Sequence, residues 1–204
     1  MYARSTTITG RTEAIDECIA FVRDRVQPAV TGMDGCLGLS MVVDRASGRC
    51  IATSAWENEE SLVFAEDVVA EFRARMAKIL GGDPQVDRWE VALMHRVQPA
   101  GDGTCCRIVW ARPQDLHVMQ ERFRSTILPQ IETFDGFCSV SMLTDRLERR
   151  ICTTTTFDSR AALDASRERA LSLRERAGRE TDVEFLEVAE FELALAHLRI
   201  PELV

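Results

Sequence analysis

The sequence predicts an α+β protein built from two tandem ferredoxin-like (βαββαβ) plaits, packed sheet to sheet as an intramolecular pseudo-dimeric α/β barrel. Three observations predict this fold. The chain repeats itself, each half has a strand–helix–strand–strand–helix–strand pattern, and each half leaves one apolar sheet face uncovered. Because a large apolar face does not stay exposed to water, we expect the two faces to cover each other.

The repeat has an offset of 101 residues. Residues 23–62 fall on residues 124–163 without a gap, and 11 of these 40 positions are identical. After a one-residue insertion the match resumes, with residues 90–95 on residues 192–197. We therefore predict a first domain at 1–97, a Pro/Gly-rich linker at 98–104 and a second domain at 105–204.

Each half then yields the same series of elements. Strands are expected at 5–9, 36–43, 49–56 and 88–95 in the first half, and at 106–110, after the turn at 135–136, at 150–157 and at 190–197 in the second. The first helix of each half carries an apolar stripe with the 3.6-residue period, which its proline should loosen or kink near the end. The stripe residues are Ile15, Cys18, Val22, Val26 and Val30, matched by Leu116, Met119, Phe123, Ile127 and Ile131.

The second helices are expected at 59–80 and 160–177. Asn58 and Ser159 stand just before them and suit the N-cap position, since their side chains accept hydrogen bonds from the first free backbone N–H groups. Gly81 suits the end of the first of these helices.

Composition and charge exclude several classes of protein. The net charge of −8 argues against binding to nucleic acid, and no segment approaches the length of a membrane span. The seven cysteines lack Cys-x-x-Cys spacing, so neither a zinc site nor a disulfide framework is predicted. With no signal-peptide pattern at the N-terminus, we expect a cytoplasmic protein. The sequence contains no metal-ligand constellation and no glycine-rich phosphate loop, so we expect no metal and no cofactor.

Two sequence features resemble the antibiotic biosynthesis monooxygenase (ABM) group of the dimeric α/β-barrel superfamily. One is the turn Gly35-Cys36-Leu37-Gly38 into the second strand, and the other is the segment 55–62 around Trp56 that ends the third strand. Both have counterparts in the second half, at 136–139 and 156–160. The resemblance implies a barrel of two plaits with ligand cavities between sheet and helices. It also implies either cofactor-free oxygenation of an electron-rich aromatic or quinol-like substrate, or haem degradation.

The haem branch of this resemblance is disfavoured by the residues. It implies an asparagine on the first strand and a histidine in the second helix. The first strands read Thr6-Thr7-Ile8-Thr9 and Arg107-Ile108-Val109-Trp110, and neither second helix contains a histidine. Haem iron would therefore lack its usual axial donor there.

His95 and His197 are the candidate catalytic residues. They stand at equivalent positions near the ends of the final strands. An imidazole with a pKa near its reference value of about 6.5 could deprotonate an acidic substrate at neutral pH. The alternative is a structural histidine, because no partner carboxylate is fixed by sequence spacing.

The candidate substrate-binding residues are hydroxyl side chains inside strands, together with one aromatic residue. They are Ser40, Ser141, Thr53, Thr154 and Trp110. Hydroxyls that face a cavity could orient a ligand, whereas hydroxyls that pair across strands would be structural. Trp110 could stack on a flat substrate or belong to the core.

Two functions remain open from the sequence. The first is a small-molecule protein that oxygenates an electron-rich aromatic or quinol-like compound without a cofactor. The second is a non-catalytic ligand-binding or assembly protein whose cavities are filled by side chains. The expected partner is a small hydrophobic or aromatic molecule, with no nucleic acid or membrane, and a further homodimer stays open.

Overall fold

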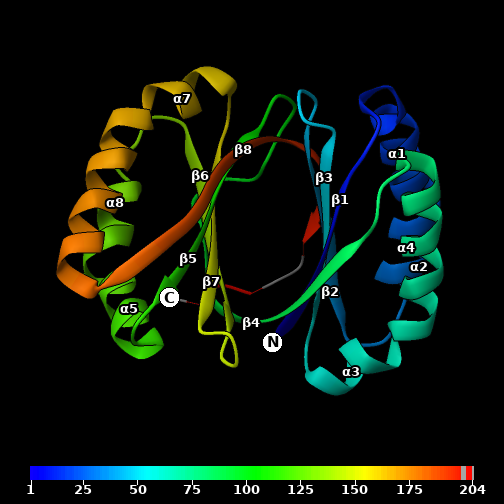
Figure 1. The fold of residues 1–204 in the computed structure, drawn as a ribbon, viewed down its shortest axis with the longest axis horizontal. Coiled ribbons are helices and arrows are strands. Elements are labelled where there is room, and N and C mark those ends of the chain that lie inside the picture. The colour runs from blue at the N-terminus through cyan, green and yellow to red at the C-terminus, as the bar shows by residue number, and fades with distance from the viewer. Residues whose placement is uncertain (199–200, 204) are drawn as a thin grey trace. The chain divides into compact units, whose positions relative to one another are not determined.

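A computed structural model describes residues 1–198 and 201–203 (Figure 1). The elements of the first repeat, in chain order, are β1 (Tyr2–Thr9), the short 3-10 helix η1 (Thr12–Ala14), α1 (Ile15–Phe21), the π-helical turn η2 (Val22–Val26), α2 (Gln27–Thr31), β2 (Cys36–Asp44), β3 (Arg49–Trp56), α3 (Glu59–Phe64), α4 (Glu66–Leu80) and β4 (Gln85–Arg96). This is the predicted βαββαβ order, with each helix divided into shorter pieces.

The second repeat follows the same order. Its elements are β5 (Cys105–Pro113), α5 (Leu116–Arg122), the π-helical turn η3 (Phe123–Ile127), α6 (Leu128–Ile131), β6 (Phe137–Asp145), β7 (Arg150–Phe157), α7 (Arg160–Ala165), α8 (Arg167–Thr181) and β8 (Val183–Leu198). The third strands have the predicted bounds in both halves. The final strands, β4 and β8, are longer than predicted.

The strands are hydrogen-bonded in the closed order β1-β3-β2-β8-β5-β7-β6-β4. Within each half the order of the first three strands, β1-β3-β2 and β5-β7-β6, is that of the ferredoxin-like plait. The predicted fold class, an α/β barrel of two βαββαβ plaits, is confirmed. The long final strands explain the closure, because each one pairs with a strand of both halves.

The chain forms two compact units, and β4 and β8 contribute to both of them. Unit 1 comprises 1–90 and 192–200, and unit 2 comprises 91–191 and 201–204. In unit 1 the end of β8 pairs with β2, with His197 opposite Leu39. The domain bounds predicted above follow the sequence repeat, and they stay a prediction.

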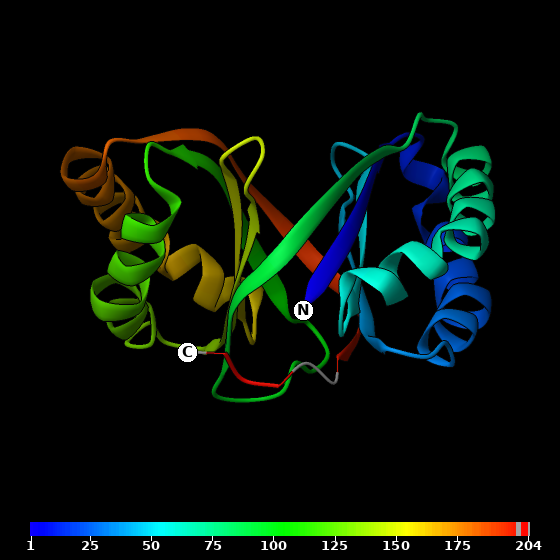
Figure 2. The ribbon, with the colours of Figure 1, turned by 90° about the horizontal axis from the view of Figure 1, so that it is seen from below.

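In each unit the helices cover one face of that unit's strands (Figure 2). The core of unit 1 lies between β1–β3 and the helices, and that of unit 2 between β5–β7 and the helices. The first-helix stripe of the first half is buried as predicted, with Cys18 and Val22 fully buried. In the second half Met119, Phe123 and Ile131 are buried, whereas Leu116 and Ile127 are partly exposed.

The first helix of each half contains a π-helical turn just before its proline, where the sequence predicted only a loosened or kinked end. A π turn precedes Pro28 in one half and Pro129 in the other, and the Gln27 and Leu128 N–H groups donate five residues back, to Val22 and Phe123. Proline has no N–H and its ring clashes with the carbonyl four residues before it. The wider turn moves that carbonyl away, so the helix continues through the proline instead of ending.

The predicted caps of the second helices are confirmed. The Asn58 side chain accepts from the Ser61 N–H at 2.8 Å, and the Ser159 hydroxyl accepts from the Ala162 N–H at 3.2 Å. Gly81 ends α4 in the left-handed conformation, with φ of 74°. In the second half Pro113 ends β5, and the Asp115 side chain caps α5.

One correction concerns the alignment of the two halves. The offset of 101 holds from the first helix to the second, but in the first strands it is 103. Arg4 lies opposite Ser54, and Arg107 lies opposite the equivalent residue, Thr155. A shorter connection between β5 and α5 accounts for the shift. Arg4 and Arg107 are therefore equivalent.

None of the helices in the part of the chain that the structure describes is long and apolar enough to cross a membrane. Within the same residues, no group of three or more His, Cys, Asp or Glu side chains could hold a metal ion.

Candidate functional site

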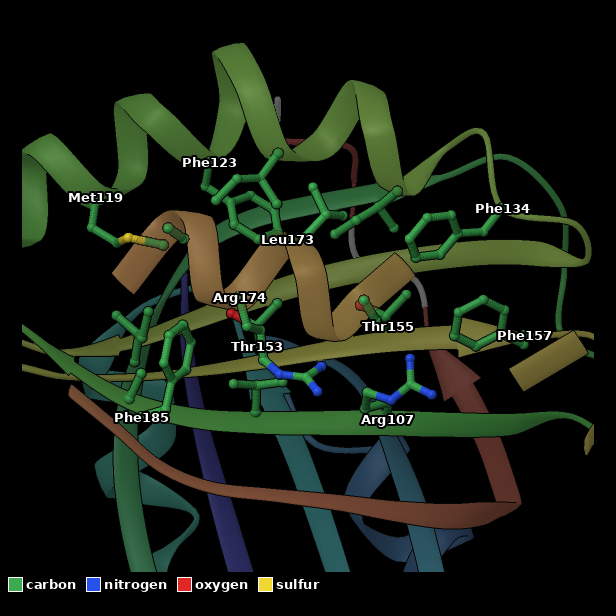
Figure 3. A pocket seen from close by; sticks show the side chains of 17 residues that line it. Arg107, Met119, Phe123, Phe134, Thr153, Thr155, Phe157, Leu173, Arg174 and Phe185 are labelled. Carbon is green, nitrogen blue, oxygen red and sulfur yellow. The ribbon is translucent and has the colours of Figure 1, made fainter. Parts of the chain in front are cut away.

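Unit 2 contains a cavity between its helices and the helix-facing side of β5 and β7. Its volume is about 630 Å³, measured out to its mouth. Figure 3 shows Phe123 and Leu173 over the cavity and Phe134 and Phe157 at one end. The remaining lining residues are Arg107, Val109, Ala111, Met119, Ile127, Ile131, Ile151, Thr153, Thr155, Ala170, Arg174, Ala177 and Phe185. A mostly apolar lining with a few polar groups is typical of a small-molecule site.

Unit 1 has an equivalent but smaller cavity, of about 380 Å³. The difference follows from the side chains at matching positions. Ala170 and Ala177 of α8 line the larger cavity, where α4 has Val69 and Met76. Likewise Ala111 of β5 replaces the buried Ile8 of β1. Smaller side chains on both the helix and the strand wall therefore open the second cavity.

Arg107 anchors one wall of the larger cavity. Its side chain is only 5% exposed and bonds to three groups. Nη1 donates to the Ser166 hydroxyl at 2.9 Å, and Nη2 donates to the Leu163 carbonyl at 3.0 Å and to Glu190 Oε1 at 2.9 Å. A buried guanidinium is tolerated only when its charge and N–H groups are satisfied in this way.

Glu190 is the counter-ion of this site. Burial raises its pKa, but hydrogen bonds from Arg167 and Arg107 outweigh burial, so the pKa lies below its ordinary value. Arg167 Nη2 lies 2.6 Å from Glu190 Oε2. The carboxylate is therefore ionised at neutral pH and fixed between two arginines.

Unit 1 holds the matching arginine with a different charge pattern. Arg4 is 1% exposed, donates to the Leu62 carbonyl at 2.8 Å and pairs with Glu66 at 2.6 Å. Glu66 matches Arg167, and Arg88 matches Glu190. The carboxylate therefore comes from the helix in unit 1 and from the final strand in unit 2. The charges at these two positions are exchanged between the halves.

The four predicted hydroxyl residues form two cross-strand pairs. Ser40 lies opposite Thr53, and Ser141 lies opposite Thr154. Successive side chains of a strand point to opposite faces. Thr154 lies between Thr153 and Thr155, which line the cavity, so its side chain points away from it. The pairing matches the structural alternative stated above, and the proposal that these residues bind substrate stays untested.

Trp110 also points away from the cavity. It stands between the lining residues Val109 and Ala111 on β5, and its ring makes an edge contact with Phe191 at 6.4 Å. Any stacking of Trp110 on a ligand would thus take place on the other face of the sheet.

His95 and His197 lie apart from the cavity lining in the described residues. His95 Nε2 is 2.6 Å from Glu132 Oε1, Nδ1 is 3.6 Å from Glu202 Oε1, and the ring stacks on Phe137. The sequence spacing did not predict a carboxylate partner for His95; in the structure that partner is Glu132, which follows α6. His197 is partly exposed and pairs through its strand with Leu39 of β2. A catalytic role for either histidine remains a proposal.

The polar residues that do reach the cavity were missed from the sequence. They are Arg107, Arg174, Thr153 and Thr155. The available signal was an arginine on the helix-facing side of the first strand in both halves, Arg4 and Arg107. A second signal was an arginine at the same position of both second helices, Arg73 and Arg174. Scattered arginines elsewhere in an acidic chain concealed these two pairs.

The cavity does not suit haem. Its lining in the described part of the chain contains no histidine, cysteine or tyrosine, and the thioether of Met119 alone would be a weak axial ligand for haem iron.

Residues 1–74 match the family model described as antibiotic biosynthesis monooxygenase. The whole chain is similar to the uncharacterized protein Rv2557 of Mycobacterium tuberculosis H37Rv. The two are 50% identical over 206 residues, which cover 100% of this chain and 92% of the relative.

The fold is similar to those of solved structures at low sequence identity. One is a candidate monooxygenase from Lactobacillus acidophilus, with a TM-score of 0.71 and 10% identity over 97% of this chain and 96% of that chain. Another is an anthrone oxidase-like protein, with a TM-score of 0.62 and 16% identity over 99% of this chain and 94% of that chain. These similarities concern the fold alone.

Proposed function

Because this chain belongs to the antibiotic biosynthesis monooxygenase family, we propose that its second half binds a small aromatic molecule and exposes it to dioxygen without a cofactor. One observation carries the proposal: an open cavity of about 630 Å³, the space at its mouth included, whose lining in the described residues is aromatic and aliphatic apart from two arginines and two threonines. Such a cavity binds flat apolar molecules and excludes water from them.

The reaction is a direct oxygenation of an activated carbon. For an anthrone-type substrate, R₂CH₂ + O₂ gives R₂C=O + H₂O, so one oxygen atom enters the product and the other leaves as water. The described lining contains no carboxylate and no imidazole to remove a proton. The substrate must therefore be acidic enough to lose its proton to water, and the protein contributes orientation and a dry environment.

The missing base also favours a second function, binding without turnover. An enzyme of this kind gains a factor of about 10² to 10⁴ from a positioned base, and the cavity offers none in the described residues. In that case the same cavity would hold its ligand unchanged.

The test combines binding with oxygen uptake. N-phenyl-1-naphthylamine, a neutral apolar probe, should bind with a saturable rise in fluorescence. Ala170→Val/Ala177→Met places larger side chains on the wall, as in the first half, and should weaken binding at least tenfold. Ala161→Val, on the exposed side of α7, is the matched control and should change nothing.

Oxygen uptake with anthrone then separates the two functions. Uptake above the buffer blank that disappears in Ala170→Val/Ala177→Met supports oxygenation in this cavity. Binding without uptake supports the second function. Unchanged probe binding in Ala170→Val/Ala177→Met would overturn both functions, because the probe would then sit elsewhere.

A further inference from the structure

Arg174 of α8 is a cation at the wall of an apolar cavity. Figure 3 shows its side chain extending into the space between α8 and the strands. It is half-buried, and in the described ranges 1–198 and 201–203 only through-space charges act on it, with no hydrogen bond and no ion pair. Partial burial removes water from the Arg174 guanidinium, and without a bonded counter-ion this desolvation is unfavourable.

The first half shows what the same residue does when it has a partner. Arg73, at the matching position of α4, lines the smaller cavity and bonds to Glu66, with Nη2 2.6 Å from Oε1. Glu66 therefore neutralises Arg73 from two helical turns earlier on the same helix.

The charge exchange between the halves removes that partner from Arg174. In the second half Arg167 stands at the position equivalent to Glu66, and the carboxylate is instead that of Glu190 on β8. There Glu190 bonds to Arg107 and Arg167. Burial and the charge of Arg107 lower the pKa of Arg174, and the more weakly acting carboxylates of Glu190 and Glu175 do not offset them. Charge compensation is thus complete for Arg107 and incomplete for Arg174.

We infer that Arg174 determines the specificity of this cavity by binding the anionic group of its ligand, a flat aromatic carboxylate or phenolate. The inference rests on the proposed function, because it names the ligand class of the same site. A guanidinium offers two parallel N–H groups that match a carboxylate, and the Thr153 and Thr155 hydroxyls on the same cavity can donate to further oxygens. The aromatic body of the ligand would lie among Phe123, Phe134 and Phe157.

The experiment compares two ligands of nearly the same shape. 2-Naphthoate carries a carboxylate at pH 7.5, and 2-naphthamide is its neutral counterpart. Titration calorimetry should show at least tenfold tighter binding of the naphthoate to the wild-type protein. Arg174→Met should reduce naphthoate affinity to that of the naphthamide and leave naphthamide affinity unchanged.

A second variant tests the charge exchange without altering the cavity lining. Arg167→Glu/Glu190→Arg recreates the pattern of the first half and keeps the net charge. The new carboxylate at 167 should pair with Arg174 and remove the preference for naphthoate. Arg73→Met, in the first half, should leave the preference intact. Thermal unfolding of each variant confirms that it is folded.

Equal affinity of wild-type protein for both ligands would overturn the inference while leaving the proposed function in place. A preference for naphthoate that persists in Arg174→Met would also overturn the inference. If Arg174→Met does not fold, a preference that persists in Arg167→Glu/Glu190→Arg would overturn it instead. Failure of both ligands and of the neutral probe to bind would contradict the proposed function and the inference together.

Discussion

Glu66 and Arg73 form an ion pair with 2.6 Å between Oε1 and Nη2, and the other carboxylate oxygen of Glu66 lies 2.6 Å from the buried Arg4. One carboxylate thus neutralises both cations of the first cavity. In the second half Glu190 forms ion pairs with Arg107 and Arg167 instead. Two repeats with the same fold therefore present cavities of different size and different free charge.

Glu66→Gln should destabilise the protein, because Arg4 would keep its charge in a buried site without a counter-ion. Removing one partner of a buried pair costs about 3–5 kcal/mol, and the partial exposure of Glu66 reduces our expectation to about 1–3 kcal/mol. Urea unfolding measures the change. Glu60→Gln, at an exposed position of α3, should shift the free energy of unfolding by less than about 0.5 kcal/mol.

Stability should fall in acid. Burial raises the pKa values of Glu66 and Glu190, but the hydrogen bonds and charges of their arginines outweigh it and lower both. A carboxyl group with a lower pKa in the folded state stabilises that state above its unfolded pKa, about 4.3, and loses this contribution as the pH falls through the folded pKa. The midpoint of urea unfolding should therefore decrease below about pH 4.3. The double variant Glu66→Gln/Glu190→Gln should show a flatter acid profile, and an unchanged profile would contradict this explanation.

Most of the cysteines should be unreactive in the native state. Burial raises the pKa of Cys18 to about 12 and that of Cys50 to about 11, so neither forms appreciable thiolate at pH 8. Of the seven cysteines, Cys36 is the one that is not buried. Dithionitrobenzoate should label Cys36 quickly in native protein and all seven in guanidinium. Rapid native labelling of a Cys36→Ser variant would count against this assignment.

His95→Ala/His197→Ala should keep probe binding and any anthrone-dependent oxygen uptake within about threefold of wild type. Neither histidine is among the residues that line the larger cavity, and His95 pairs with Glu132. The loss of a general base would instead lower the rate by about 10² or more. A loss of that size with unchanged probe binding would establish one of the histidines as the base.

The sequence predicted the fold well because the repeat supplied each pattern twice. The stripe around Cys18 and Val22, the caps at Asn58 and Ser159 and the third strands are local features, and local patterns determine them. The π turns before Pro28 and Pro129 went unpredicted in detail, since a proline can end a helix as well as widen one turn.

The site was less predictable than the fold. The alternation of a strand assigns a residue to a face, but the face on which a cavity remains depends on side-chain volumes across several elements. Ala170 and Ala177 open the cavity only because Ala111 is small as well. The sequence also provided no reason to select Arg174, because its proposed role depends on the absence of a carboxylate at position 167.

Bromine-substituted 2-naphthoate soaked into crystals of the protein tests the central claim most directly, since anomalous scattering locates the bromine independently of phase bias. We predict a bromine peak inside the cavity of the second half, among Phe123, Phe134 and Phe157, with the carboxylate against Arg174. No comparable peak should occur in the first half. A peak on the face of the sheet that carries Trp110, or in the smaller cavity beside Arg73, would contradict the account.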